Sequence, residues 1–366
     1  SGPHGLRMLG DFGADVVRVE PPWTRGTVGP DEEYVRDTGF YIDNTPTDRY
    51  WMTAGSYNKW NYNKRNVSVR LNTKEGKAVL EKLVASADVV IDNFSTQAWE
   101  KLGVTYDWMR SVNPAIVAVS MPGYGRWGPG RLRVSYGNQL EAFMGADSLM
   151  GYEDGEPHMF AIAWPDPVAG CTAAACALLG IYERDSTSEG QFYEVCQVEG
   201  ATNFIGPDLV KFGVTGKIPR RIGNKSNTFA PQGVYACAGD DRWLAVTVTS
   251  DQAWRTLATA IGRTDLGDRT DLATVEGRRE AHAEIDDAIS AWSRSRDHKE
   301  AAATLQAVGV GAFAVYDARD SLDDPYLWDA QAFVRVQGEP LPGFPYWLSR
   351  TSPAVHLPVA DVGEHN

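Results

Sequence analysis

Residues 67–92, VSVRLNTKEGKAVLEKLVASADVVID, contain the pattern that decides the fold class. Alternation over Val67–Leu71 predicts a strand, and apolar residues at helical spacing predict an amphipathic helix over Gly76–Ala87. Asn72 is the expected N-cap of that helix. The nearly continuous apolar run Asp88–Asp92 is typical of a buried parallel strand. Together these elements predict one βαβ unit.

The alternation of strands and helices continues on both sides of this unit. Before it, we expect a helix over Leu6–Phe12 and a strand over Asp15–Glu20. After it, we expect a helix, a strand, a helix buried on nearly all sides, a strand and a helix, over Thr96–Val112, Ala115–Ser120, Asp166–Glu183, Gly190–Val195 and 197–212. Repeated βα units predict an α/β, Rossmann-like parallel sheet with helices on its faces.

The pattern changes after a basic stretch rich in Gly, Pro and Asn. Two strands, Gly233–Ala238 and Arg242–Val248, are expected to pair antiparallel, and amphipathic helices follow them. The chain is therefore expected to divide into a large α/β domain at 1–214, a linker at 215–232, a smaller α+β domain at 233–320, and a segment at 321–366 that returns to the large domain.

Composition excludes several classes of protein. The chain has 366 residues, of which 43% are hydrophobic and 23% charged, as is typical of globular proteins. It has 35 basic and 48 acidic residues, a net charge of −13, which argues against nucleic-acid and anionic-membrane binders. No apolar run approaches the roughly 18 residues of a transmembrane helix. A phosphate-bearing ligand would therefore need a local basic patch.

The cysteines and histidines predict no metal centre. The four cysteines form no C-x-x-C pair, and the six histidines lack metal-ligand spacing. We expect reduced thiols, no metal, no permanently bound cofactor and a cytoplasmic protein. Both ends look trimmed, and we expect a fragment whose first strand is missing.

One local basic patch is present between residues 59 and 82, with seven Lys or Arg against two acids. Lys64, Arg65 and Lys74 fall where a strand meets a helix N-terminus, which suits a phosphate because free N–H groups and the helix dipole point there. A solvated helix face is the alternative, and it accounts well for Lys77 and Lys82.

Gly123–Gly128 matches the G-x-G-x-x-G pattern directly after an expected strand. A dinucleotide site requires that this pattern open a helix, whereas Pro129 and Gly130 follow here. We therefore expect a flexible Gly-rich loop near a site rather than a nicotinamide-dependent oxidoreductase.

Asp166 lies between two prolines in the stretch WPDP at 164–167, at the start of the buried helix. One interpretation is a plain helix cap, which Asp followed by Pro favours. The other is a nucleophile, because a helix N-terminus stabilises an ionised carboxylate. The local pattern leaves both open.

An ordered series of short motifs extends over nearly the whole chain. They are Ser1–Pro3, Phe12–Pro21, Asn63–Arg65, Leu71–Gly76, Asp92–Phe94, Gly123–Gly125, Asp166–Pro167 with Gly170, Gly190–Gln191, Arg221–Asn224, Ala230–Pro231, Asp324–Pro325 and Gly363–His365. In this order they resemble the class III CoA-transferases, which include formyl-CoA transferase and carnitine CoA-transferase. Alpha-methylacyl-CoA racemase shares that fold.

The resemblance implies that Asp166 is the nucleophile, forming an aspartyl-acyl anhydride and then an aspartyl-CoA thioester, with the CoA thioester as substrate. It also implies an interlocked homodimer, threaded near 215–232 and 321–345. Together with the basic patch, it assigns the CoA contacts to Ser1, Gly2, Lys64, Arg65, Leu71, Asn72, Thr73, Lys74, Asn93, Phe94, Ser95 and Lys101. The substrate pocket is assigned to Gly123, Tyr124, Gly125, Tyr136, Gly137 and Asn138.

Three departures from the family pattern bear on specificity. Formyl-CoA transferase has Glu where this chain has Gly137, which argues against formyl or oxalyl substrates. It has Arg where this chain has Pro21, so one CoA contact is missing or replaced. The racemase needs a His within 134–138, and none occurs there. An acyl-CoA epimerase or isomerase, or a non-catalytic CoA-binding subunit of a fused or heteromeric pair, remain the alternatives.

Aromatic residues are frequent in 21–60 and 124–160, and they favour a roomy apolar acyl pocket. The residues concerned are Trp23, Tyr41, Tyr50, Trp51, Tyr57, Trp60, Tyr124, Trp127, Tyr136, Phe143, Tyr152 and Phe160. Core packing or dimer contacts would explain the same residues.

Overall fold

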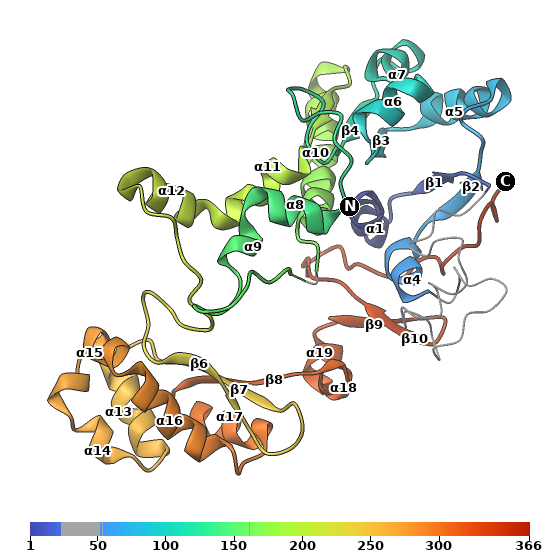
Figure 1. Ribbon diagram of the computed structural model, residues 1–366. Coiled ribbons are helices and arrows are strands. Elements are labelled where there is room, and N and C mark those ends of the chain that lie inside the picture. The colour runs from blue at the N-terminus through green and yellow to red at the C-terminus, as the bar shows by residue number, and fades with distance from the viewer. Residues whose placement is uncertain (23–51, 53, 161) are drawn as a thin grey trace. The chain divides into compact units, whose positions relative to one another are not determined.

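The computed structural model describes residues 1–22, 52, 54–160 and 162–366 (Figure 1). The chain forms two compact units. The first unit comprises Ser1–Asp147, Met159–Lys217 and Pro325–Asn366, and the second comprises Ser148–His158 and Ile218–Asp324.

Parallel strands form the centre of the first unit. β3 (Val89–Asp92), β4 (Val117–Ser120) and β5 (Phe192–Glu194) pair in that order, all parallel. β1 (Val17–Glu20) and β2 (Arg65–Ser68) form a separate parallel pair. The α/β prediction with parallel strands is confirmed, although these strands form two sheets and β2 begins two residues before the expected position.

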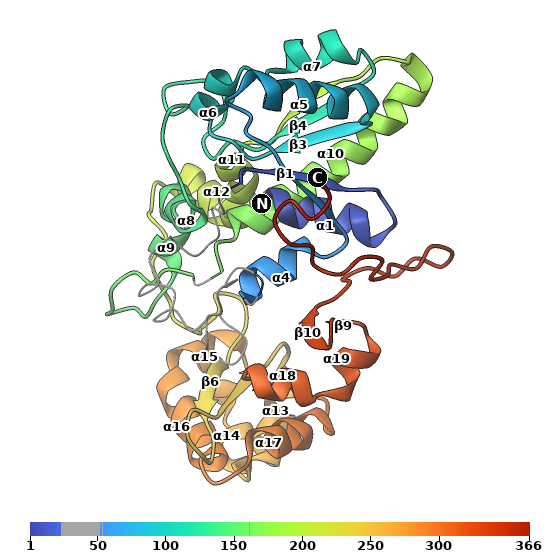
Figure 2. The ribbon, with the colours of Figure 1, turned by 90° about the vertical axis from the view of Figure 1, so that its right-hand side faces the viewer.

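Helices cover both faces of the β3–β4–β5 sheet, as Figure 2 shows. On one face lie α5 (Lys74–Ser86), α6 (Thr96–Leu102) and α7 (Tyr106–Val112), whose apolar side chains pack on Ile116 and Ala118. The other face packs against α10 (Pro165–Thr187), which contributes three buried alanines, Ala169, Ala173 and Ala177, and the partly buried Cys176. Small residues let α10 approach the sheet closely.

α1 (Gly2–Asp11) packs along α10 through glycines. A side chain at Gly5 would collide with the carbonyl oxygen of Gly170, so the two helices touch backbone to backbone. This close approach brings Ser1, at the start of α1, to the start of α10.

The prediction that α10 is buried on nearly all sides is wrong for the single chain. Its sheet side is buried, but Leu178, Leu179 and Tyr182 are exposed, Tyr182 by 78%. The sequence shows apolar residues on nearly all sides of this helix, but it does not show whether a neighbouring element covers each of them.

Three helix boundaries also differ from the sequence-based expectation. The N-cap of α5 is Thr73, not Asn72, because Thr73 Oγ1 accepts from Gly76 N at 3.0 Å. The helix expected over 96–112 is divided into α6 and α7, because Gly103 ends α6 in a left-handed conformation and Thr105 caps α7. The helix expected over 197–212 consists of α11 (Gln197–Thr202), a 3-10 turn and α12 (Gly206–Thr215).

The remaining elements of the first unit were not predicted. They are α4 (Gly55–Asn61), α8 (Gly137–Met144), α19 (Pro325–Asp329) and the antiparallel hairpin of β9 (Phe333–Val336) with β10 (Glu339–Pro342), while α9 (Ala146–Leu149) extends from the first unit into the second.

The second unit is an antiparallel sheet covered by helices. β6 (Gln232–Ala236) pairs with β7 (Trp243–Thr247) as predicted, and β8 (Gly311–Val315) adds an unpredicted third strand. Its core is built around Trp254 and Leu257. The helices are α13 (Asp251–Ala260), α14 (Thr264–Gly267), α15 (Val275–Glu280), α16 (His282–Ser293), α17 (His298–Gln306) and α18 (Ala318–Asp323). Within the described part of the chain, none of the helices combines the length and apolar character that a membrane crossing requires.

Candidate functional site

Asp166 lies in the first turn of α10 with its carboxylate accessible. The helix begins at Pro165, and Trp164 is the N-cap residue, so Asp166 does not cap the helix. The interpretation of Asp166 as a plain cap is therefore wrong. Its side chain is 39% exposed, and the backbone nitrogen of Ser1 donates to Oδ1 at 2.9 Å. This hydrogen bond orients one carboxylate oxygen and leaves the other available.

The second oxygen faces the start of α8. A Cβ placed on Gly137 would lie 2.6 Å from Oδ2 of Asp166 and 2.5 Å from Cβ of Ala163. Both distances are below van der Waals contact, so only glycine fits there without displacement. The first N–H groups of a helix lack intrahelical acceptors, and here they belong to Gly137 and Asn138.

One buried acid in α8 was missed by the sequence analysis. Glu141 is fully buried, and its Oε1 accepts a hydrogen bond from Trp164 N at 2.6 Å. Burial raises the pKa of Glu141 above its usual range. The signal in the sequence was a single acid within an apolar helical stretch, which by itself does not distinguish a buried position from an exposed one.

Two of the predicted CoA contacts lie next to one another. A Cβ at Gly2 would be 3.2 Å from Oδ1 of Asn93, so the start of α1 touches the loop after β3. Asn93, Phe94 and Ser95 are exposed in that loop, and Ser95 caps α6 by accepting from Ala98 N. Ser1 and Gly2 thus connect this loop to Asp166.

The Gly-rich loop after β4 is anchored by a buried arginine. Arg126 contacts Ser120 and Asp92, its guanidinium stacks 3.6 Å from the centre of Trp99, and its backbone N donates to Glu194 at 2.9 Å. Burial raises the pKa of Asp92 to about 6. These contacts join the ends of β3, β4 and β5 and anchor the loop at Arg126.

The other residues of the predicted substrate pocket divide between the loop and α8. Gly123 packs directly against the side chain of Ser135, so the Gly-rich loop and the approach to Gly137 are in contact. Tyr124 packs edge-on against Phe143 at 5.0 Å. Gly125 is buried, Asn138 is half-buried, and Tyr136 is 77% exposed.

The basic patch is divided between buried and exposed side chains. Lys64 is buried, its Nζ donates to the carbonyl oxygens of Pro3 and Trp60, and burial lowers its pKa well below its usual range. Arg65 is half-exposed and pairs with Asp15 at 3.4 Å. Lys74 is exposed at the first position of α5, and the preceding Leu71, Asn72 and Thr73 are half-buried or exposed. Lys101 is exposed in the last turn of α6.

Those of the aromatic residues that the structure describes do not gather around one cavity. Trp23, Tyr41, Tyr50 and Trp51 lie outside the described residues. Tyr57 belongs to a buried core, and Phe160 packs against Trp164 at 5.6 Å. The apolar acyl pocket stays a prediction.

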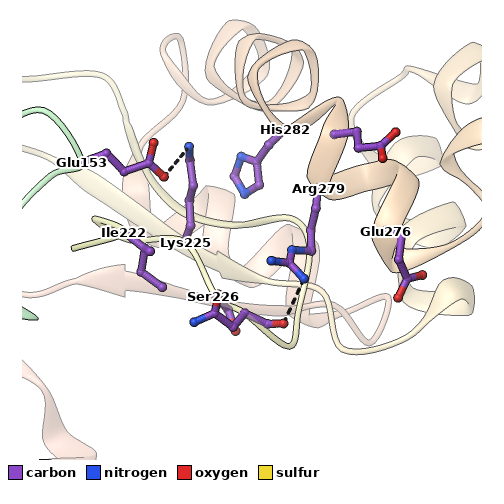
Figure 3. A pocket seen from close by; sticks show the side chains of 9 residues that line it. Glu153, Ile222, Lys225, Ser226, Glu276, Arg279 and His282 are labelled. Atoms are coloured by element: carbon purple, nitrogen blue, oxygen red, sulfur yellow. Dashed lines mark hydrogen bonds and ion pairs between the residues drawn. The ribbon is translucent and has the colours of Figure 1, made fainter. Parts of the chain in front are cut away.

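Asp166 lines neither of two cavities in the described part of the chain. One, of about 870 Å³ in the first unit, is lined by His4, Arg7 and Trp60 together with residues 329–332, 342–347, 352 and 353. The other, of about 390 Å³ in the second unit, is shown in Figure 3. Charges of both signs line it, including the Lys225–Glu153 pair at 3.4 Å.

Metal-ligating side chains do not cluster in the portion of the chain that the structure describes, where no group of three or more His, Cys, Asp or Glu could hold an ion.

Comparisons with known proteins agree over the full chain. The sequence profile of CoA-transferase family III matches residues 1–366. The chain is 30% identical over 336 residues to succinyl-CoA–D-citramalate CoA-transferase of Chloroflexus aurantiacus, covering 92% of this chain and 80% of that protein. It is 26% identical over 370 residues to succinate–glutarate CoA-transferase of Agrobacterium fabrum, covering 100% of this chain and 90% of that protein. The fold is similar to that of a CAIB/BAIF family protein from Brucella suis, with a TM-score of 0.87 at 24% identity, covering 99% of this chain and 93% of that one.

Proposed function

The chain belongs to CoA-transferase family III, and on that premise we propose that it transfers CoA between carboxylic acids through covalent intermediates on Asp166. The observation that supports this proposal most is the accessible, uncapped carboxylate of Asp166. One of its oxygens is oriented by Ser1 N at 2.9 Å, and the other faces the start of α8 at Gly137.

In the first half-reaction, Asp166 forms an anhydride and then a thioester. A carboxylate oxygen attacks the thioester carbonyl, the C–S bond breaks, and an aspartyl-acyl anhydride and CoA thiolate result. The thiolate then attacks the aspartyl carbonyl of the anhydride. This step releases the donor acid as a carboxylate and leaves an aspartyl-CoA thioester.

The second half-reaction is the reverse sequence with the acceptor acid. The acceptor carboxylate attacks the aspartyl-CoA thioester, and the thiolate returns to the acceptor's carbonyl. Asp166 is regenerated as a carboxylate. One thioester replaces another and no step requires a proton, so the site needs positioned N–H donors rather than a general acid or base.

Gly137 and Asn138 are placed to supply such donors. Their N–H groups begin α8 beside Asp166, where the helix itself provides no acceptor. Negative charge that develops on a tetrahedral oxygen is stabilised there by fixed dipoles. Gly137 has no side chain, and this leaves the approach to Asp166 open.

CoA is proposed to bind along the exposed loops on either side of α5 and α6. Asn93 and Gly2 are in contact next to Ser1, and they are assigned to the thiol end of CoA. Lys74 and Lys101 are exposed and are assigned to phosphate groups. Lys64 is part of the same motif, but its ammonium is directed to carbonyls of α1 and α4, so we assign it to holding Ser1 in place.

The test is exchange of CoA between a labelled free acid and an unlabelled acyl-CoA. Formation of labelled thioester by the wild type, and its loss in Asp166→Asn, is the expected result. An epimerase would be established if the wild type bound acyl-CoA without exchanging its CoA and catalysed deuterium uptake at the α carbon of the acyl group. Binding with neither reaction would indicate a non-catalytic CoA-binding subunit.

The acyl panel for this test has two arms. The relatives' names include succinyl, citramalate and glutarate, so short dicarboxylic acids form the first arm. The expected apolar pocket calls for medium-chain, aromatic and polycyclic acyl-CoAs as the second. Formyl-CoA and oxalyl-CoA serve as the comparison, because Gly137 argues against both.

We also propose a homodimer, because the first unit exposes large apolar side chains on consecutive helices. They are Leu178, Leu179 and Tyr182 of α10, Phe204 after α11, and Val210, Phe212 and Val214 of α12. Some relatives carry the names of alpha and beta subunits of one CoA-transferase, so a heteromer is the alternative. Light scattering on the purified protein distinguishes a dimer from a monomer. A cytoplasmic location stays a prediction from the cysteines.

A further inference from the structure

Glu141 occupies a position where an apolar side chain would be the ordinary choice. It lies in α8, is fully buried, and neighbours the buried Leu140 and Met144 of the same helix. Its Oε2 is buried without a hydrogen-bond partner among the described residues. Burying a carboxyl group is unfavourable unless its contacts compensate, so the contact that Glu141 does make requires an explanation.

That contact is with the turn that carries the nucleophile. Oε1 of Glu141 accepts from the backbone nitrogen of Trp164 at 2.6 Å, two residues before Asp166. The preceding residue, Ala163, has a φ of +52°, a left-handed conformation that is unfavourable for a residue with a Cβ. Such a conformation persists only where surrounding contacts hold it.

The same helix touches the nucleophile directly. Gly137 lies one turn before Glu141 in α8 and abuts both Oδ2 of Asp166 and Ala163. α8 therefore contacts the turn from 163 to 166 at two points. The backbone of Gly137 makes the first contact, and the carboxylate of Glu141 makes the second. Neither contact can shift without moving the other.

We propose that Glu141 is a positioning residue that holds the turn 163–166 and thereby sets the distance between the carboxylate of Asp166 and the first N–H groups of α8. This inference rests on the proposed function of Asp166. The role belongs to the acceptor oxygen of Glu141, which means that a neutral acceptor of the same length should perform it equally well.

Ordinary packing does not explain the acid at this position. The negative charges of Asp147 and Asp166 both act against an ionised Glu141, as does its burial. A leucine would fill a similar volume without these penalties. The hydrogen bond from Trp164 N is the interaction that compensates for them.

The test compares Glu141→Leu, which removes the acceptor, with Glu141→Gln, which keeps a carbonyl oxygen at the same reach. Glu189→Leu is the matched control, because it makes the same chemical change at a carboxylate that is 72% exposed in the turn between α10 and β5. For each variant kcat, KM for the acyl-CoA and the rate of hydroxylamine-trapped acylation of Asp166 are measured.

We expect Glu141→Leu to lower kcat and the acylation rate by about 10- to 100-fold, since a displacement near 1 Å at a nucleophile costs on that order. KM should stay within about threefold, and Glu141→Gln should retain at least a third of the wild-type kcat. Because unfolded protein lowers the apparent kcat without changing KM, the rates are compared per folded protein, with the folded fraction taken from cooperative unfolding. If Glu141→Leu does not unfold cooperatively, Glu141→Met replaces it, because methionine adapts to irregular space.

Two results would overturn the proposal. One is a folded Glu141→Leu or Glu141→Met variant that acylates Asp166 at the wild-type rate. The other is a folded Glu141→Gln variant as impaired as Glu141→Leu, which would assign the effect to the charge. Failure of the proposed function is separate, because it appears as absence of any adduct on Asp166 in the wild type.

Discussion

Gly137→Ala is the perturbation that examines the geometry of the site most closely. The new Cβ would lie 2.6 Å from Oδ2 of Asp166 and 2.5 Å from Cβ of Ala163. Ordinary contacts between such atoms are about 3.5–4.0 Å, so the carboxylate, the turn or α8 must move by about 1 Å. A misplacement of this size costs about 100-fold in rate, which corresponds to about 2.7 kcal/mol in the barrier. Overpacking is expected to lower stability by about 1–3 kcal/mol as well.

The assay is steady-state CoA exchange with both substrates varied, together with thermal melting. We expect kcat to fall about 100-fold, with the affinity for CoA within about threefold of wild type. Gly200→Ala is the matched control, because a Cβ there meets only Cγ1 of Val168 at 3.9 Å in a neighbouring helix, and its activity should stay within about twofold. A folded Gly137→Ala protein with wild-type kcat would refute the reasoning, since the carboxylate could not then react from the position described.

Three further outcomes are expected. Arg126→Met should lower the free energy of unfolding in urea by about 3–5 kcal/mol, because it removes the guanidinium that pairs with the largely buried Asp92 carboxylate; a loss below about 1 kcal/mol would contradict the anchoring role. Lys74→Ala and Lys101→Ala should each raise KM for acyl-CoA about two- to fivefold with little change in kcat, and the difference should shrink at high salt; a pure kcat effect would count against the phosphate assignment. Burial, with a contribution from Arg7, lowers the pKa of His4 from 6.5 to about 4. Between these two pH values the unfolded chain binds a proton at His4 and the folded chain does not. The contribution of His4 to the free energy of unfolding is therefore fully present above pH 6.5 and is lost as the pH falls towards 4. His4→Asn should therefore lose less melting temperature between pH 7 and 4.5 than wild type, and equal losses would show that His4 is not responsible.

The strand-and-helix order of the first unit was predictable because its signals are local. The alternation around β3 and the small residues of α10 follow from periodicity alone. The division between α6 and α7 was missed although Gly103 and Thr105 are stop and start signals, because the apolar spacing continues across them. The third antiparallel strand, β8, pairs with β7 across more than sixty residues, and no local pattern specifies that pairing.

The sequence indicates candidate site residues, but it does not predict how their side chains are placed. Asp166 is a candidate from its position at the start of an apolar helix and from the family resemblance, whereas its freedom from capping depends on α10 beginning one residue earlier, at Pro165. Lys64 was grouped with the basic patch by charge, but burial decides where its ammonium points, and burial follows from tertiary packing with α1. Glu141 was missed for the same reason, because its importance lies in a contact across 23 residues of sequence.

The central claim is that Asp166 becomes covalently acylated, and peptide mass spectrometry tests it most directly. The protein is incubated with each acyl-CoA of the panel, quenched with hydroxylamine and digested. We expect a hydroxamate on the peptide that contains Asp166 with at least one donor, and none in Asp166→Asn. No modification of that peptide by any acyl-CoA that demonstrably exchanges its CoA with an acid would contradict it.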